Sequence, residues 1–468
     1  MSLRIGHKTT SALLLLAVCL FMTVVTMTGF SDRSPEIALV LYLFGMLVFL
    51  LAASSRILKT VNDIFIFWGS FVVKTVYAFY RFPFSEITRP VLNGDAGGFW
   101  RTASQYYQGN FKRIYTSFPY VLSFEFRIFG RNVLCCCLTN IVLSMIMVLL
   151  VVEIMNRFGI EGKSRLFAVA VSALLPYGIQ VCNSILREAI YFAFITASFF
   201  AYIKYLETRK AVNVFVAILL LIPVLFLHIG YFPIAAVYLI DLFAHEKIKT
   251  RRDLLNRILI IAAFTAFVIL TSRLNSIGYL TSGNGIEGII AKISGANSEE
   301  YMGEAGSRYL ARIKITSLPT FLLYAPVKWF YYMFSPLPTN WRGLMDIFVF
   351  LVDGLVHFLF VWSSIACIRR IKRNNSDGHL DKVLRIVRTG FWAVVLCGFV
   401  FGLGTSTAGT AIRHRDVMIG IEAVLFGFAS YTRTGGLLKP VSGTAAADDG
   451  APASDIDEPA ADNESVAL

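Results

Sequence analysis

Residues 37–53 of this chain read IALVLYLFGMLVFLLAA, an apolar run without a charged side chain. A helix that crosses the hydrocarbon core of a bilayer needs roughly 20 mostly apolar residues, so this run is typical of a membrane span. It does not alternate polar and apolar residues as a barrel strand would, and a span in lipid must satisfy its own backbone hydrogen bonds. A transmembrane helix is therefore predicted.

Comparable runs recur along the chain. They cover Ala12–Phe30, Ile64–Tyr80, Val133–Met155, Phe167–Val181, Ala189–Tyr205, Val212–Leu227, Tyr231–Ala244, Leu255–Thr271, Phe348–Ile368, Phe391–Gly404 and Val417–Tyr431. The 468 residues are 56% hydrophobic and 16% charged, with a mean hydropathy of +0.65, whereas a soluble domain carries roughly 25% charged residues. We expect an all-α, polytopic transmembrane helical bundle of about 12 spans.

The basic residues indicate how the chain is oriented. The net charge of +13 comes from clusters in short loops beside apolar runs, which is the positive-inside pattern of a membrane protein and not a sign of nucleic-acid binding. With Arg4 and Lys8 in the cytoplasm, Phe82–Asn132 becomes a large external loop after the third span. Both termini are then cytoplasmic.

One apolar segment does not fit as a span. If Thr316–Phe334, which contains Pro319 and Pro326, crossed the membrane, the basic cluster at 369–373 would be forced outside. We therefore expect a re-entrant or interfacial segment near 316–334. Residues 1–431 form one transmembrane domain in this interpretation, and the acidic, Ala-rich residues 432–468 form a disordered cytoplasmic tail.

This topology brings ionisable residues of several segments to the external face. They are Asp95, Arg187, Glu188, His228, Lys328, Arg413, His414 and Arg415. Asp95 lies in the glycine-rich stretch NGDAGGF, just before a predicted amphipathic helix at Phe99–Tyr107. A carboxylate on such a turn can approach a substrate hydroxyl as a general base, or it can cap the helix.

Arg187 and Glu188 open a predicted span, where a charged pair often marks the start of a helix. The functional alternative is that Glu188 assists Asp95 or holds an ion, while Arg187 contacts phosphate. Arg413, His414 and Arg415 enter the last span from outside, against the positive-inside trend. They either reach lipid headgroups or bind phosphate or pyrophosphate, which guanidinium groups match with paired donors.

His228 and Lys328 also have two interpretations each. His228 lies at a break between two apolar runs, where it could contact a ligand or bond to a freed backbone carbonyl. Lys328 stands among aromatic residues as an interfacial anchor or as part of a site. The sequence has no Walker loop, no strand-borne GxGxxG and no Cys or His metal-ligand spacing. No cofactor is assigned. Whether a divalent cation is bound stays an open question, because Asp95 and Glu188 alone are too few ligands to argue for one.

Five motifs together carry a resemblance. The turn GDAGGF, the stretch FPYVLSFEFRIFGRN, the helix SILREAIYFAFITASFF, the element FSPLP and the late segment GTAIRHR resemble bacterial membrane glycosyltransferases of the GT-C superfamily, including oligosaccharide repeat-unit polymerases. The resemblance covers about Asp95–Tyr431. The chain departs from that pattern in having two spans before the one that leads to the acidic loop, and no paired-acid motif in the loop.

The resemblance implies an inverting transferase in the bacterial cytoplasmic membrane. Its donor is a sugar on polyprenyl phosphate or pyrophosphate, its acceptor is a glycan or a lipid-linked glycan, and its active site is external. Asp95 is then the base, with Glu188 beside it. Two alternatives stay open: a repeat-unit polymerase that works through Arg413, His414 and Arg415, and a lipid-linked glycan flippase or secondary transporter, which would show repeated halves and ionisable groups near the midplane.

Overall fold

The computed structural model describes residues 34–110, 117–245, 307–310, 315–374 and 380–434, together with residue 313 and scattered positions between 251 and 265. Helices form the regular structure of these residues, apart from one antiparallel bridge between Arg308 and Thr407. The predicted all-α class is confirmed for this part of the chain.

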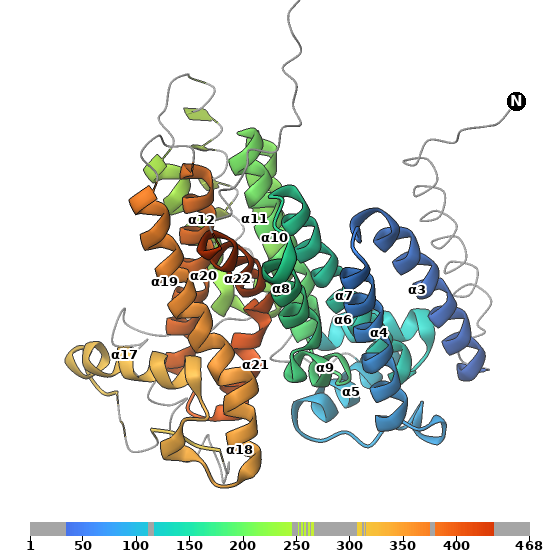
Figure 1. The fold of residues 1–468 in the computed structure, drawn as a ribbon. Helices are drawn as coiled ribbons and strands as arrows, with labels where there is room; N and C mark the ends of the chain where they lie inside the picture. Colours follow the sequence, from blue (N-terminus) through green and yellow to red (C-terminus); the bar gives the residue numbers. More distant parts are fainter. Residues whose placement is uncertain are drawn as a thin grey trace, which may run out of the picture.

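The long helices run side by side (Figure 1). The helices are α3 (Pro35–Ile57), α4 (Val61–Arg81), α5 (Gly94–Tyr107), α6 (Phe118–Phe129), α7 (Val133–Arg157), α8 (Gly162–Leu174), α9 (Pro176–Cys182), α10 (Glu188–Thr208), α11 (Ala211–Leu227), α12 (Phe232–His245), α17 (Leu318–Phe334), α18 (Leu344–Val349), α19 (Leu355–Asn374), α20 (Asp381–Gly404), α21 (Ala408–Arg415) and α22 (Ile419–Arg433). A π-helical turn, η4 (Phe350–Gly354), joins α18 to α19, and a 3-10 turn, η5 (Asp416–Met418), joins α21 to α22.

Seven helical stretches in the described residues are long and apolar enough to cross a membrane. They are Pro35–Ile57, Val61–Arg81, Val133–Arg157, Gly162–Cys182, Glu188–Thr208, Leu344–Asn374 and Asp381–Gly404. Each contains a run that the sequence predicted. Two shorter apolar helices, Ala211–Leu227 and Ile229–His245, match two more. These helices indicate a multi-pass membrane protein, while the count of about 12 spans stays a prediction.

The structure describes the remaining predicted segments only in part. The run Ala12–Phe30 and the tail 432–468 lie outside the described residues, apart from the first residues of the tail, and Leu255–Thr271 is described only at scattered positions. The last predicted span forms η5 and α22. Helix α22 has 15 residues, so it is only about 22 Å long at about 1.5 Å per residue.

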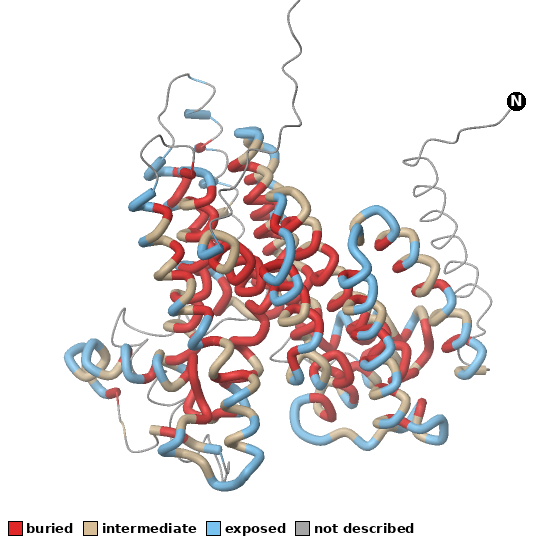
Figure 2. The backbone as a smooth tube through the Cα atoms, in the orientation of Figure 1, coloured by how far each residue is buried: buried red, intermediate tan, exposed pale blue. Residues whose placement is uncertain are grey.

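Helix α22 lies in the centre of the molecule, where buried residues concentrate (Figure 2). Its glycines allow neighbouring helices to come close. A Cβ atom on Gly420 would lie 2.0 Å from Thr196 Oγ1 of α10, and one on Gly427 would lie 2.6 Å from Met155 Sδ of α7. Small residues serve this purpose at helix contacts in membranes. α22 is therefore a tightly packed base for the short helix α21.

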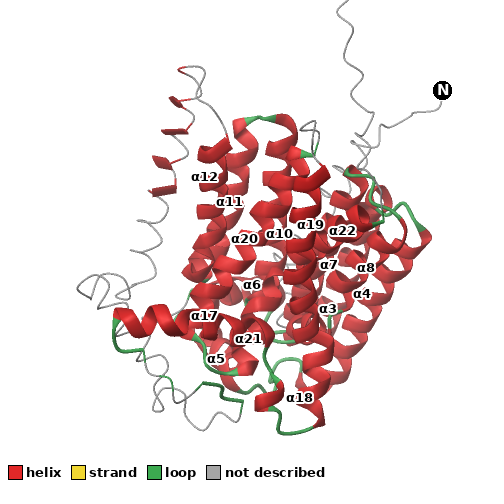
Figure 3. Cartoon of the chain, turned by 60° about the vertical axis from the view of Figure 1, so that its left-hand side comes forward, coloured by secondary structure: helices red, strands yellow, loops and turns green. Residues whose placement is uncertain are grey.

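Helix α17 lies across the axes of the long helices (Figures 1 and 3). It crosses α20 at two glycines spaced four residues apart: a Cβ atom on Gly398 would lie 2.9 Å from Trp329 Nε1, and one on Gly402 would lie 3.2 Å from Trp329 Cα. This orientation agrees with the expected re-entrant or interfacial segment near 316–334, although its position in a membrane stays a prediction. The predicted loop Phe82–Asn132 is largely helical, since it forms α5 and α6.

Candidate functional site

Helix α21 directs three consecutive side chains into three different surroundings. Arg413, His414 and Arg415 are its last residues, and successive residues of an α-helix are turned by about 100°. Arg413 points to α5 and α10, His414 packs against aromatic rings, and Arg415 points to η4. The basic run therefore does not form a single phosphate-binding patch in this structure.

The Arg413 guanidinium joins two carboxylates that are far apart in the sequence. Its Nε donates to Glu188 Oε1 at 2.5 Å, and its Nη1 donates to Asp95 Oδ2. The Glu188 side chain is fully buried, the Arg413 side chain is 16% exposed and that of Asp95 is 62% exposed. Burial acts to lower the pKa of Arg413, but the two carboxylates outweigh it and raise that pKa above its ordinary value. The three residues combine a buried anchor with an accessible acid.

Glycines set the position of Asp95. Gly94 begins α5 with a φ of +59°, in the left-handed region that glycine adopts most easily. A Cβ atom on Gly97 would lie 2.4 Å from the Leu92 carbonyl oxygen, so only glycine fits there. The N-cap residue of α5 is Asn93, and Asp95 lies within the first turn with its side chain on Arg413. Asp95 therefore does not cap the helix, and α5 begins before the predicted Phe99.

Arg187 and the two histidines lie close to Arg413. Arg187 is the N-cap residue of α10, as the sequence indicated, and its Nη1 donates to the Leu227 carbonyl at 2.9 Å. The His228 and His414 rings have centroids 5.3 Å apart. Burial, followed by the nearby Arg187 and Arg413 charges, lowers the pKa of His228 to about 3. Burial, together with His228 and the two arginines, likewise lowers the pKa of His414.

Both histidines are therefore neutral near pH 7. The His228 Nδ1 accepts a hydrogen bond from the Gly230 N–H at 3.1 Å, which is a backbone contact but not the freed carbonyl that the sequence suggested. The Phe401 ring lies 4.9 Å from the His228 ring and 4.7 Å from the His414 ring. The two imidazoles thus line the site as uncharged polar groups.

The structure places Lys328 and Arg415 away from this group. Lys328 on α17 is fully buried and donates to the Leu403 carbonyl at 3.3 Å and to Ser406 Oγ at 3.0 Å, so it holds the connection from α20 to α21. Burial lowers the pKa of Lys328 to about 8. Arg415 pairs with Asp353 and donates to the Tyr332 carbonyl at 3.0 Å.

Asp353 belongs to a second group of charged residues that the sequence analysis missed. Asp353, His357, Asp416 and Glu422 are all buried and lie close together. A signal was present, because Asp353 and His357 are ionisable residues one helical turn apart inside the apolar run Phe348–Ile368. Ionisable residues inside a membrane segment are functional candidates by default.

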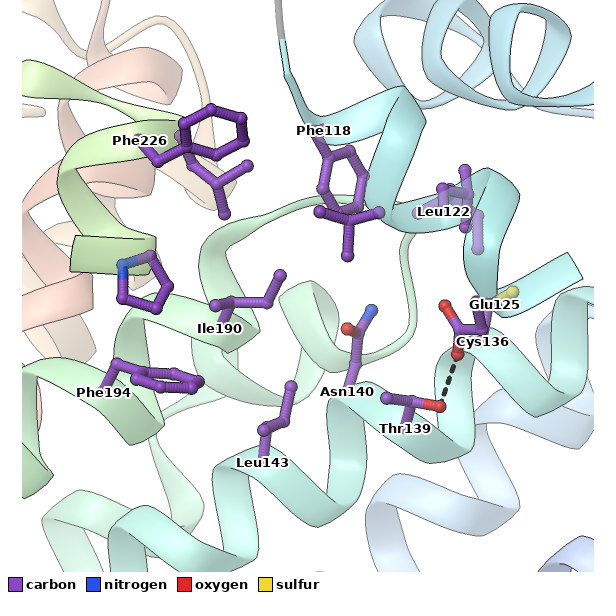
Figure 4. Close-up of a pocket in the computed structure, with 14 residues that line it drawn as sticks. Phe118, Leu122, Glu125, Cys136, Thr139, Asn140, Leu143, Ile190, Phe194 and Phe226 are labelled. Carbon is purple, nitrogen blue, oxygen red and sulfur yellow. Dashed lines mark hydrogen bonds between the residues drawn. The ribbon is translucent and has the colours of Figure 1, made fainter. Parts of the chain in front are cut away.

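An apolar pocket of about 270 Å³ lies between α6, α7, α10 and α11 (Figure 4). Ile185 and Ile190, which flank Arg187 and Glu188 in the chain, contribute to its lining, and so does Leu227. Its acidic group is Glu125, which accepts a hydrogen bond from the Thr139 hydroxyl. Burial raises the pKa of Glu125 to about 7, although hydrogen bonds from Thr139 and Cys136 oppose that shift.

The geometry thus separates the eight predicted site residues into three sets. Asp95, Glu188 and Arg413 are in direct contact; Arg187, His228 and His414 lie alongside; Lys328 and Arg415 lie elsewhere. No protein-family model, no curated protein and no solved structure matches this chain. The functional argument therefore depends on the residues themselves.

Proposed function

We propose that this protein is a membrane-embedded glycosyltransferase that uses a polyprenyl-phosphate- or polyprenyl-pyrophosphate-linked sugar on the external face of the cytoplasmic membrane. The reaction would contribute to a cell-surface polysaccharide or glycan. The observation that carries this proposal is the contact of Arg413 with both Asp95 and Glu188. An accessible carboxylate can act as a general base, and a guanidinium can stabilise the charge of a leaving phosphate.

In the proposed reaction, an acceptor hydroxyl oxygen bonds to the anomeric carbon of the donor sugar as the bond from that carbon to the phosphate oxygen breaks. The hydroxyl proton moves to the Asp95 carboxylate as general base. The leaving phosphate keeps the bonding electrons, and Arg413 stabilises the negative charge that develops on it. Glu188 is buried and anchored to Arg413, so we assign it a positioning role and not contact with the sugar.

Asp95 and a substrate phosphate would compete for the same guanidinium. A guanidinium presents several N–H donors in a planar fork that matches phosphate oxygens as well as carboxylates. When phosphate replaces Asp95 at Nη1 of Arg413, the Asp95 carboxylate becomes free to accept a proton. Glu188 retains its contact with Nε during this exchange. Donor binding would thus prepare the base.

The apolar pocket supports a donor with a lipid chain. Its lining consists largely of aliphatic and aromatic side chains, and Ile185, Ile190 and Leu227 connect it to the surroundings of Arg187 and Glu188. A prenyl segment is apolar and matches a site lined mainly by hydrophobic and aromatic side chains. A water-soluble nucleotide-sugar donor would not need an apolar pocket beside the charged residues.

The test compares lipid-linked and surface glycans in cells that carry Asp95→Asn or the wild-type chain. Glu86→Gln is the matched control, because Glu86 is an acid of the same segment, in the 3-10 turn Phe84–Glu86 before α5. Loss of the glycan in Asp95→Asn, with normal membrane abundance and a normal profile in Glu86→Gln, would support the proposal. An unchanged profile in Asp95→Asn would remove the carboxylate from the mechanism.

Arg187 and the two neutral histidines next to Arg413 support a second candidate, a repeat-unit polymerase with an arginine-centred mechanism. Arg187, His228 and His414 surround the position that a pyrophosphate would take at Arg413. In that case Arg413→Lys would shorten the surface glycan to single units, while Asp95→Asn would leave its length unchanged.

A further inference from the structure

Three buried carboxylates from two separate segments converge on the buried His357. The His357 Nε2 lies 3.0 Å from Asp416 Oδ1 and 3.6 Å from Asp353 Oδ1, and its Nδ1 lies 2.8 Å from Glu422 Oε2. Residue exposures are 3% for Asp353 and 0% for His357, Asp416 and Glu422. Asp353 lies in the π-helical turn η4, and such turns are common at functional sites.

Two of the six carboxylate oxygens of this group are hydrogen-bonded, Asp416 Oδ1 with His357 Nε2 and Asp353 Oδ2 with Arg415, and the other four are not bonded to any described residue. Within the described part of the chain, Asp353 Oδ1, Asp416 Oδ2 and both Glu422 carboxylate oxygens are buried without a hydrogen-bond partner. The His357 Nδ1 is close to Glu422 but outside hydrogen-bond geometry. A buried polar atom without a partner costs about 1–3 kcal/mol, and more when it is charged. Several such atoms facing one imidazole indicate that something else binds there.

The charges of the group lead to the same conclusion. Arg415 pairs with Asp353 and lies 3.7 Å from Asp416 Oδ1. Three carboxylates and this one guanidinium leave two negative charges when His357 is neutral, the form that binds a metal, and one when it is protonated. A buried excess of charge must be compensated, and one divalent cation would balance it.

We propose that Asp353, His357 and Asp416 bind a divalent first-row transition-metal ion such as Mn²⁺ or Zn²⁺. Their donor atoms lie within 4.8 Å of one another, so small side-chain rotations bring them onto one ion. One imidazole and two carboxylates suit these metals better than Mg²⁺ or Ca²⁺, which prefer oxygen ligands alone. Glu422 Oε2 lies 2.8 Å from Nδ1, so a small rotation would let it accept a hydrogen bond and orient the imidazole. Arg415 holds the second oxygen of Asp353, as outer partners of metal ligands usually do.

The ion would join η4 and α19 to the connection between α21 and α22. Asp416 follows α21 directly, so the metal would fix the helix that carries Arg413. The site is closed to solvent, which favours a structural ion. This inference stands on its own geometry and does not depend on the proposed glycosyl transfer.

The experiment measures the metal content of the full-length protein, purified in detergent without chelator, by mass spectrometry of Mn, Fe, Zn, Mg and Ca. We expect about one first-row ion per chain, and an at least fivefold lower content in His357→Ala and Asp416→Asn. Asp241→Asn is the matched control, because Asp241 is also a buried acid, 8% exposed, that pairs with Arg385 at 2.7 Å outside the group. Its metal content should equal that of the wild type.

Only monodisperse fractions are compared, and a second measurement covers the case in which the ligand variants do not fold. Wild-type protein treated with EDTA should melt at a lower temperature, and added Mn²⁺ or Zn²⁺ should restore the melting temperature. A wild-type chain that carries no metal and does not respond to added ions would overturn the proposal. Full metal content in a folded His357→Ala protein would also overturn it.

Discussion

Arg413 and Glu188 form an ion pair whose carboxylate is fully buried, whereas the partner on the other side of Arg413, Asp95, is mostly exposed. Glu188→Gln leaves a largely buried guanidinium without its inner counter-charge, which costs about 3–5 kcal/mol. Asp95→Asn removes an exposed partner and costs at most about 1 kcal/mol. Thermal unfolding in detergent should show the difference. Equal losses in the two variants would contradict this assignment of roles.

Arg413→Lys tests whether the planar guanidinium is needed. Lysine keeps the positive charge, but it cannot contact Glu188 and Asp95 through two fixed N–H directions. We expect about a 100-fold lower rate of glycan formation, the size typical for loss of one charge-stabilising donor. Arg101→Lys, on the same helix as Asp95, is the control and should keep the wild-type rate. A fully active Arg413→Lys protein would show that charge alone is sufficient.

The sequence predicted the helical class and most of the long helices, because apolar runs of membrane length leave few alternatives. Ile37–Ala53 and Val133–Met155 appear as α3 and α7 with small extensions. The ends of α11 and α22 also lie within two residues of the predicted runs Val212–Leu227 and Val417–Tyr431. The crossing orientation of α17 depends on the fit of Gly398 and Gly402 against Trp329, which hydropathy does not reveal.

The candidate site was predicted only in part. Asp95, Glu188 and Arg413 were expected on one face, and they are in direct contact. Arg415 was grouped with Arg413 because the two are close in sequence, yet the helical turn directs it to Asp353. Which charged residues pair depends on the direction of each side chain. A topology derived from the basic residues in the loops does not predict that direction.

The low pKa of His228 makes a prediction for stability at acid pH. Its folded pKa is about 3, against about 6.5 in the unfolded chain. Between these values the unfolded state binds more protons, so this contribution to stability is complete above about pH 6.5 and is lost as the pH falls toward 3. The melting temperature of the wild type should therefore fall more between pH 7.5 and 4.5 than that of His228→Asn. His245→Gln, at the end of α12, should follow the wild type.

The raised pKa of Glu125 predicts the opposite dependence of stability on pH. Its folded pKa is about 7, against about 4.3 in the unfolded chain, so the folded state holds the proton more tightly. The resulting stabilisation is complete below about pH 4.3 and is lost as the pH rises through 7. Glu125→Gln mimics the neutral acid, so we expect it to melt above the wild type at pH 8 and close to it at pH 5. Glu161→Gln, at an exposed position, should match the wild type at both values.

The packing of α22 predicts a strong effect for a single methyl group. In Gly420→Ala the new Cβ atom would lie 2.0 Å from Thr196 Oγ1 and 3.1 Å from Met147 Cγ, so α10 or α7 must move, at a cost of about 1–3 kcal/mol or more. Gly69→Ala on α4 is the control, because nothing lies within 4 Å of its new Cβ atom and alanine favours a helix by up to about 1 kcal/mol. Thermal unfolding should show a loss of stability in Gly420→Ala, and none in Gly69→Ala. Since α22 continues directly from η5 and α21, Gly420→Ala should also disturb the contact of Arg413 with Glu188. A Gly420→Ala protein as stable and active as the wild type would mean that α22 is not held this closely between α7 and α10.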